Sequence, residues 1–247
     1  MSEVISSIAD GVLRLKLNRS KKYNALTGDM YRALTIQLEQ AQSNDDVSVI
    51  LLSGAGDHFC AGNDIADFVQ FIESQHDSEL PATGFIRNLA GNSKPLVVAV
   101  QGQCVGVGAT LTLHADAVYA SPTTVFSVPF VDLGVVSEAG SSLLLPRRIG
   151  DLQARQMILG GKPLKATDPA SHGLFTEITE NHLEQAIACA KNWANKPTEA
   201  IQSCRQLLNS DSHLVRERLE RESAEFQRLL ASEECQARLN AFLKRRG

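Results

Sequence analysis

The sequence lacks an excess of positive charge and a long apolar run. Its 24 lysines and arginines stand against 28 aspartates and glutamates, for a net charge of -4. A general nucleic-acid-binding protein would carry a strongly basic balance. No apolar run approaches the roughly 18–20 residues that span a bilayer. We therefore expect no nucleic-acid partner and no membrane association.

Targeting signals of the common kinds are also missing. Residues 1–4 lack the basic and then apolar profile of a signal peptide. Residues 244–247 do not form a Ser-Lys-Leu peroxisomal address. A cytoplasmic location is the resulting expectation.

Cysteine and histidine are too sparse and too scattered for a metal site. The five cysteines are odd in number and form no CxxC pair, and the six histidines form no HxxxH pair. We expect reduced, buried thiols and no metal ion.

The first half of the chain alternates predicted strands and helices, within a length that suits one sizeable domain or a domain with an appendage. Alternating polarity predicts a strand over residues 10–18, and Asp10-Gly11 favours a hairpin. Thr27 can cap a helix with apolar residues at helical spacing. Further strands are predicted over 47–52, 94–101 and 117–120, one or two helices over 65–93 with Pro81 and Gly84 as breakers, and a short helix over 107–114.

The second half is predicted to be mostly helical. A short strand is expected over 174–179, and helices over 141–148, 151–160, 182–195, 198–209, 211–230 and 233–245. The last two helices carry opposite charges four residues apart, such as Arg218 and Glu222, which is typical of a solvated face. Their apolar residues still need a surface to cover, so these helices should dock on the body or on another subunit.

Two glycine-rich turns, at residues 54–59 and 106–108, each follow a predicted strand. Neither has the third glycine of a dinucleotide fingerprint or the Lys-Ser/Thr ending of a phosphate loop. Each turn alone is more typical of a tight structural turn. If the two face each other, however, their unpaired N–H groups could hold a developing oxyanion.

Glu138 stands in a loop of small and apolar residues. One interpretation is a carboxylate at a helix N-terminus, where the helix dipole favours it. The other is a base for proton transfer, because an apolar pocket raises the pKa of a carboxyl group.

With these motifs in place, the sequence resembles the crotonase superfamily, the enoyl-CoA hydratase/isomerase group. Four motifs carry the resemblance in order: NRSKKYNAL (18–26), FCAGND (59–64), KPLVVAVQG with GVG (94–102 and 106–108), and FSVPF (126–130). The resemblance covers about residues 3–210. It implies an α/β fold, a spiral of ββα turns over residues 1–195, followed by a helical trimerisation region over 196–247. It also implies homotrimers or hexamers and an acyl-CoA substrate, with no separate cofactor because coenzyme A is part of that substrate.

The resemblance also assigns a site. The backbone N–H groups of Asn63 and Val107 would form the oxyanion hole. Lys21, Lys22 and Ala25 would lie at the adenine nucleotide end of coenzyme A, although the lysines suit a solvated loop equally well. The channel for the thioester would be lined by Ala61, Gly62, Asn63, Asp64 and Ile65.

Departures from the family pattern bear on the reaction. Hydratases of this group use two glutamates, at the positions that here hold Thr110 and Phe130. Glu138 falls where the peroxisomal-type Δ3,Δ2-enoyl-CoA isomerases carry their single base, although the proline before that base is absent here. The resemblance therefore favours an isomerase of fatty acid β-oxidation, which converts 3-enoyl-CoA to 2-trans-enoyl-CoA through a dienolate.

Two alternatives stay open. One is an enoyl-CoA hydratase, or other crotonase-type chemistry, in which Glu138 or Asp132 acts with water. The other is a protein that binds acyl-CoA without turnover.

Overall fold

The computed structural model describes residues 2–74 and 79–246. The chain begins with an antiparallel hairpin of β1 (Val4–Ala9) and β2 (Val12–Leu17). Asp10 and Gly11 join the two strands at φ values of 55° and 72°, which suits the two-residue turn predicted there.

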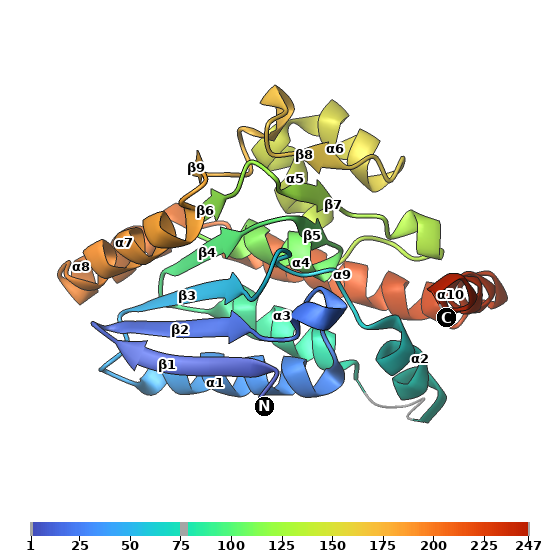
Figure 1. Ribbon diagram of the computed structural model, residues 1–247, viewed down its shortest axis with the longest axis horizontal. Helices are drawn as coiled ribbons and strands as arrows, with labels where there is room; N and C mark the ends of the chain where they lie inside the picture. The colour runs from blue at the N-terminus through green and yellow to red at the C-terminus, as the bar shows by residue number, and fades with distance from the viewer. Residues whose placement is uncertain (1, 75–78, 247) are drawn as a thin grey trace.

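The main sheet grows from this hairpin by parallel pairing. Its strand order is β1-β2-β3-β4-β6-β9, with β3 (Val49–Gly54), β4 (Leu96–Val100), β6 (Ala117–Ala120) and β9 (Glu177–Ile178). All five residues of β4 are buried, as expected for a strand covered on both faces. A smaller sheet of order β5-β7-β8 packs beside it, from β5 (Gln103–Val105), β7 (Val125–Ser127) and β8 (Leu164–Lys165) (Figure 1).

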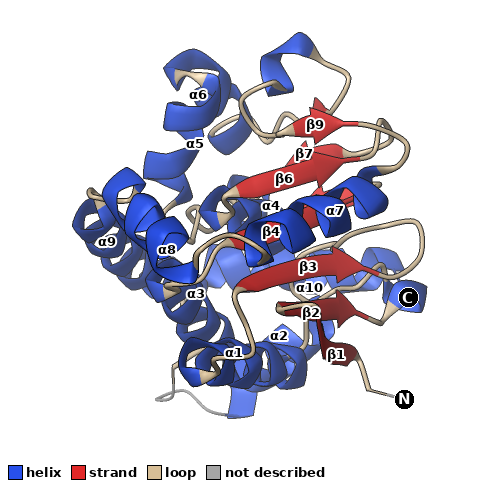
Figure 2. Ribbon diagram, turned by 90° about the vertical axis from the view of Figure 1, so that its left-hand side faces the viewer, coloured by secondary structure: helices blue, strands red, loops and turns tan. Residues whose placement is uncertain are grey.

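Helices cover both faces of the main sheet. The principal core lies on the side of α1 (Gly28–Ser43) and α3 (Pro81–Gly91). On the opposite face α7 (His182–Ala194) lies across the strands (Figure 2), where Ala186 and Ala190 pack on Val97 and Ala99. The predicted cap is confirmed, because Thr27 Oγ1 accepts the Met30 N–H at 3.3 Å.

The segment predicted over 65–93 forms two helices, α2 (Ile65–Ser74) and α3, and residues 75–78 lie outside the described residues. Pro81 takes the first position of α3, as proline does when it starts a helix. The expectation that Gly84 breaks a helix is wrong, because Gly84 lies inside α3. A helical glycine costs only about 1 kcal/mol, which the burial of Phe85, Ile86 and Leu89 outweighs.

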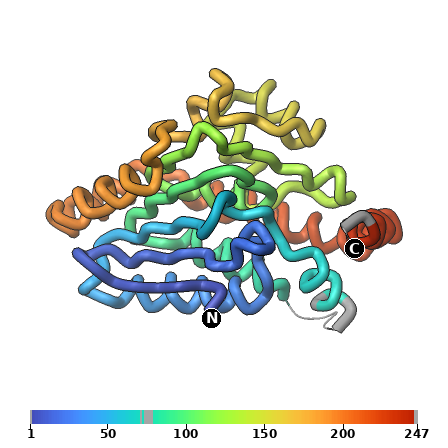
Figure 3. Tube along the Cα trace, viewed as in Figure 1, coloured from blue at the N-terminus to red at the C-terminus, as the bar shows by residue number. Residues whose placement is uncertain are grey.

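The C-terminal helices follow the predicted order closely, as α5 (Ser141–Ile149), α6 (Asp151–Ile158), α7, α8 (Thr198–Leu208), α9 (Ser212–Leu230) and α10 (Glu233–Arg246). Both α9 and α10 dock on the body of the same chain: α9 packs on α3 and α5, and α10 packs on α2 (Figure 3). Leu219, Phe226 and Leu239 are thereby buried in the principal core. No helix in the described part of the chain has the length and apolar content to cross a bilayer.

The expectation of buried thiols is only partly right. Cys60, Cys104 and Cys235 are buried, and Cys189 is half-buried. Cys204 is exposed, because α8 buries none of its residues against this chain.

Candidate functional site

A cleft of about 1000 Å³ opens where the ends of the central strands meet the C-terminal helices. One wall comes from the turn after β2, including the 3-10 helix η1 (Ser20–Lys22), and from the segment that leads into α2. The other comes from the 3-10 helix η3 (Val131–Leu133) and from α9 and α10. The structure brings all the predicted binding residues to this cleft: Lys21, Lys22, Ala25, Ala61, Gly62, Asn63, Asp64, Ile65 and Val107.

The two motifs that end in Asn63 and Val107 lie directly against each other. Val105 donates its N–H to Cys60 O at 2.9 Å. Gly62 has a φ of 90°, and a Cβ at this position would lie 3.1 Å from Val105 O. Only glycine therefore lets the two backbones approach this closely.

The backbone pattern leaves the N–H groups of Asn63 and Val107 unused. The Leu26 N–H donates to Gly62 O, and Leu26 O accepts the Asp64 N–H. The N–H of Asn63, which lies between these two residues, therefore points away from Leu26. Val107 is the first residue of α4 (Val107–Thr110), and the N–H of such a residue has no acceptor within its own helix. Among the described residues, neither N–H takes part in a tertiary hydrogen bond. Both N–H groups belong to residues that line the cleft, where a substrate oxygen could accept a hydrogen bond from each of them.

The earlier glycine turn, residues 54–59, has a structural role. It packs on Gly102, where a Cβ would lie 2.2 Å from Asp57 O. The turn is held there by Gln101, whose side-chain amide donates to Gly54 O and Gly56 O. The donor that faces Val107 thus comes from Asn63, four residues after this turn ends.

Side chains behind the cleft fix the Asn63 segment. The Tyr31 hydroxyl donates to Asn63 Oδ1. Asp64 pairs with Arg19 at 2.7 Å and accepts the N–H groups of Ala66 and Asp67. Burial alone would raise the pKa of Asp64, but these partners outweigh it and hold the pKa below its usual value. Asp64 is therefore a fixed anion and not a free base.

Glu138 is buried, at 8% exposure, and its Oε1 has no hydrogen-bond partner among the described residues. Burial, reinforced by the nearby charge of Glu222, raises its pKa to about 8. Glu138 does not line the open cleft. It acts electrostatically on Tyr31 and Cys60, whose pKa values are raised chiefly by burial and further by its charge. Glu138 therefore lies close enough for its charge to act on Tyr31, the residue that is hydrogen-bonded to Asn63.

The interpretation of Glu138 as a helix N-terminal carboxylate is wrong. The helix after it, α5, begins at Ser141. The carboxylate at the N-terminus of this helix is that of Glu222 from α9. Glu222 accepts the Gly140 N–H at 2.7 Å and the Ser142 N–H at 2.9 Å. This role could not be predicted from the sequence, because the four-residue spacing from Arg218 to Glu222 is typical of a solvated helix face. Arg218 instead donates to Ser142 Oγ.

The positions that differ from the hydratase pattern are buried and carry no ionisable group. Thr110 is fully buried on α4, and Phe130 is buried beside the cleft. Asp132 belongs to the cleft wall, but its carboxylate lies 2.7 Å from where a Cβ of Gly161 would stand. Its side chain therefore faces the turn at Gly161.

The chain is similar to known proteins over nearly its whole length. The model of the family described as Enoyl-CoA hydratase/isomerase matches residues 7–247. The rat "Enoyl-CoA delta isomerase 2" is 32% identical over 96% of this chain, which spans 62% of that protein's length. In Escherichia coli K12, the "1,2-epoxyphenylacetyl-CoA isomerase" is 31% identical and the "2,3-dehydroadipyl-CoA hydratase" 30%, each covering 100% of this chain and 97% of the relative.

Solved structures agree with the sequence comparison. The enoyl-CoA hydratase/isomerase from Pseudoalteromonas atlantica superposes with a TM-score of 0.91 at 33% identity, over 100% of this chain and 98% of its own. OdaA from Pseudomonas aeruginosa gives the same TM-score and identity over 98% and 99%.

Proposed function

Because the chain belongs to the enoyl-CoA hydratase/isomerase family and has the crotonase fold, we propose that it is a Δ3,Δ2-enoyl-CoA isomerase. It would move the double bond of a 3-enoyl-CoA to the 2-trans position during fatty acid β-oxidation. The family and fold expected from the motifs are confirmed by these matches. The relatives include both isomerases and a hydratase, so the proposed reaction depends on the site itself.

The observation that carries the proposal is the state of the carboxylates. Glu138 is buried and has an unpaired oxygen, as a base requires. The carboxylates among the described cleft-lining residues are Asp64, which is paired with Arg19, and Asp132, which faces Gly161. One free carboxylate suits a reaction in which a single base removes and returns a proton.

The proposed mechanism uses the backbone donors and this one base. The thioester oxygen accepts hydrogen bonds from the Asn63 and Val107 N–H groups, which lowers the pKa of the C2 protons. Glu138 takes a proton from C2, and the electron pair enters a dienolate whose charge rests on the thioester oxygen. The same carboxyl group then delivers the proton to C4, and the double bond stands between C2 and C3. The proposed reaction steps use no metal ion and no redox cofactor.

The cleft offers complementary parts for an acyl-CoA. Lys21 and Lys22 would bind the phosphates of coenzyme A, because both line the cleft, as do Arg238 and Phe242 of α10. The cleft also has an apolar part that suits an acyl chain, lined by Phe68, Leu133, Phe226, Leu230 and Leu239.

We also propose that the chain assembles as a homotrimer or a pair of trimers through its C-terminal helices. Leu207 and Leu208 of α8 are 77% and 85% exposed, which leaves an apolar edge uncovered in the single chain. Light scattering coupled to size-exclusion chromatography tests the assembly: a monomeric mass would contradict it.

The function is tested by giving the protein a 3-enoyl-CoA and a 2-trans-enoyl-CoA in separate assays. We expect isomerisation of the first substrate and little hydration of the second. Glu138→Gln should lower isomerisation by about 10²–10⁴-fold, since it removes a positioned base. Faster hydration than isomerisation would favour a hydratase, and binding without either reaction would favour an acyl-CoA-binding protein.

A further inference from the structure

A second buried carboxylate lies behind Glu138. Glu222, on α9, is 6% exposed and does not line the cleft. Its two oxygens accept from the Gly140 and Ser142 N–H groups, at 2.7 Å and 2.9 Å. These amides belong to the N-terminus of α5, the positive end of that helix. Glu222 therefore joins α9 to the loop that carries Glu138, across 82 residues of sequence.

That loop has an unfavourable backbone conformation. Ala139 and Gly140, directly after Glu138, have φ values of 61° and 69°. A residue with a Cβ rarely adopts this left-handed conformation unless the surroundings impose it. Here they do so from two sides, because His114 Nε2 lies 2.8 Å from Ala139 O while Glu222 holds Gly140.

The two carboxylates have unequal surroundings. Burial raises the pKa of Glu222, but hydrogen bonds from Ser142 and Gly140 and the charge of Arg218 act against that rise and favour its ionised form. Glu138 Oε1 accepts no hydrogen bond from the described residues. When two buried carboxyl groups interact, the one with more donors stays ionised and the other takes the proton first.

We propose that Glu222 is a positioning residue for Glu138: by accepting the Gly140 and Ser142 N–H groups it holds residues 138–142 in the conformation that presents the base, and it is the negatively charged neighbour of that base. This inference rests on the proposed function, in which Glu138 moves the proton. It gives α9, which already forms part of the cleft wall, a second role in holding the loop of the base.

Three of the ionisable groups around Glu138 and its loop are neutral at pH 7. Two of them are Tyr31 of α1 and Cys60 of the segment after β3, whose pKa values burial raises, for Cys60 to about 12. On the side of the 3-10 helix η2 (Leu111–His114), burial lowers the pKa of His114 to about 4, helped by Arg205 and Arg148. Neutral His114 donates its Nε2–H to the Ala139 carbonyl. The charges that act on the loop thus come from α9, with Glu222 and Arg218, and from the arginines behind His114.

The test is the pH profile of Glu222→Gln, which removes the charge and keeps nearly the same shape. The acidic limb of kcat/KM should move to lower pH by about one unit or more, because Glu138 loses a negative neighbour. The turnover number should fall about tenfold, with KM little changed because Glu222 does not touch the cleft. The matched control is Glu225→Gln on the same helix, whose carboxylate pairs with Arg228 at the surface and should leave the profile unchanged.

Glu222→Asp retains the charge and should restore the pH limb towards the wild-type position. It also serves as the test if Glu222→Gln does not fold. A fall in turnover with an unshifted limb in Glu222→Gln, or a shifted limb in Glu222→Asp, overturns the proposal.

A measurement independent of turnover separates this inference from the proposed function. Carbon-13 labelled glutamate allows the Glu138 carboxyl to be titrated by NMR, with its signal assigned by its loss in Glu138→Gln. If the wild type does not isomerise 3-enoyl-CoA but Glu222→Gln lowers the Glu138 midpoint, the proposed function fails and the coupling stands. An unchanged midpoint overturns the coupling, whatever the reaction.

Discussion

Tyr31 on α1 donates its hydroxyl hydrogen to the side-chain oxygen of Asn63, 32 residues later in the chain. The bond ties the first helix to the residue whose backbone N–H faces the cleft. Tyr31 is in turn fixed by packing on Phe85, with ring centroids 5.6 Å apart. A side chain outside the reaction thereby helps to set the direction of a proposed oxyanion donor.

The Tyr31→Phe variant should therefore lose both stability and activity. It removes the partner of the half-buried Asn63 Oδ1, which costs about 0.5–1.5 kcal/mol of unfolding free energy. Urea denaturation measures the first effect and kcat/KM the second. Tyr119→Phe, on the opposite face of the sheet beside Cys189, is the control and should leave kcat/KM unchanged. Equal activity losses in the two variants would contradict the role of Tyr31.

Replacing Gly62 by alanine should disturb the pair of donors. The new Cβ would lie 3.1 Å from Val105 O at a φ of 90°, so the Asn63 segment must shift. Loss of one oxyanion donor typically costs about 10²–10³ in kcat, and we expect a fall of that size. Gly84→Ala is the matched control, because a Cβ there meets nothing within 4 Å and alanine favours a helix. A wild-type rate in Gly62→Ala would show that this donor is not used.

Glu138 should make the protein less stable as the pH rises. Its pKa is raised from 4.5 to about 8 on folding, so the folded state binds the proton more tightly. The contribution of this proton to stability is present below pH 4.5 and is lost as the pH rises to about 8, on the order of 1.4 kcal/mol per pH unit. Glu138→Gln should thus be more stable than wild type at pH 8, and the difference should shrink at pH 5. Chemical denaturation at both values measures it, and a pH-independent difference would contradict the raised pKa.

The same pKa predicts the pH dependence of activity. Glu138 must be ionised to accept a proton, so kcat/KM should rise with pH through an apparent pKa of about 8. Initial rates with 3-enoyl-CoA over pH 6–9 give the profile. A rate that is flat across this range would show that another group is the base.

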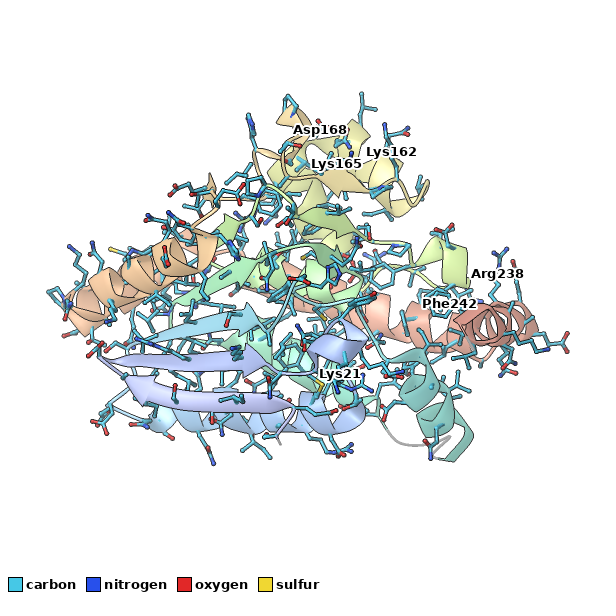
Figure 4. All side chains as sticks on the ribbon, in the orientation of Figure 1. Lys21, Lys162, Lys165, Asp168, Arg238 and Phe242 are labelled. Carbon is cyan, nitrogen blue, oxygen red and sulfur yellow. The ribbon has the colours of Figure 1, made fainter. Side chains whose placement is uncertain are left out.

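The double variant Lys21→Ala with Lys22→Ala tests the coenzyme A end of the cleft. We expect KM to rise several-fold and to depend less on salt, because two charges near the phosphates are removed. The turnover number should stay near wild type. Lys162→Ala with Lys165→Ala removes two charges far from Lys21 (Figure 4) and is the control. An equal rise in KM in both double variants would point to net charge instead of a local site.

Local patterns in the sequence were enough to predict the long helices and strands. Helical spacing and the Thr27 cap predicted α1, and buried β-branched runs predicted β3 and β4. The short strands β5, β7 and β8 were not predicted. Strands of two or three residues carry no periodicity of their own and are defined by their pairing with distant segments.

The proposed binding residues were predicted from the motifs and not from periodicity. Spacing alone favoured tight structural turns, and only the family resemblance pointed to Asn63 and Val107. The packing of Gly62 on Val105 explains physically why those motifs occur together.

The sequence by itself determined the long elements, the family and those cleft-lining residues that belong to the family motifs. The tertiary structure decided which carboxylates are free and which are held. Asp64 is neutralised by Arg19, Asp132 faces Gly161, and Glu222 is occupied by the amides of α5. Glu138 is left buried without such partners. The proton affinity of a carboxyl group depends on burial and on nearby donors, and packing brought these from segments up to 82 residues away.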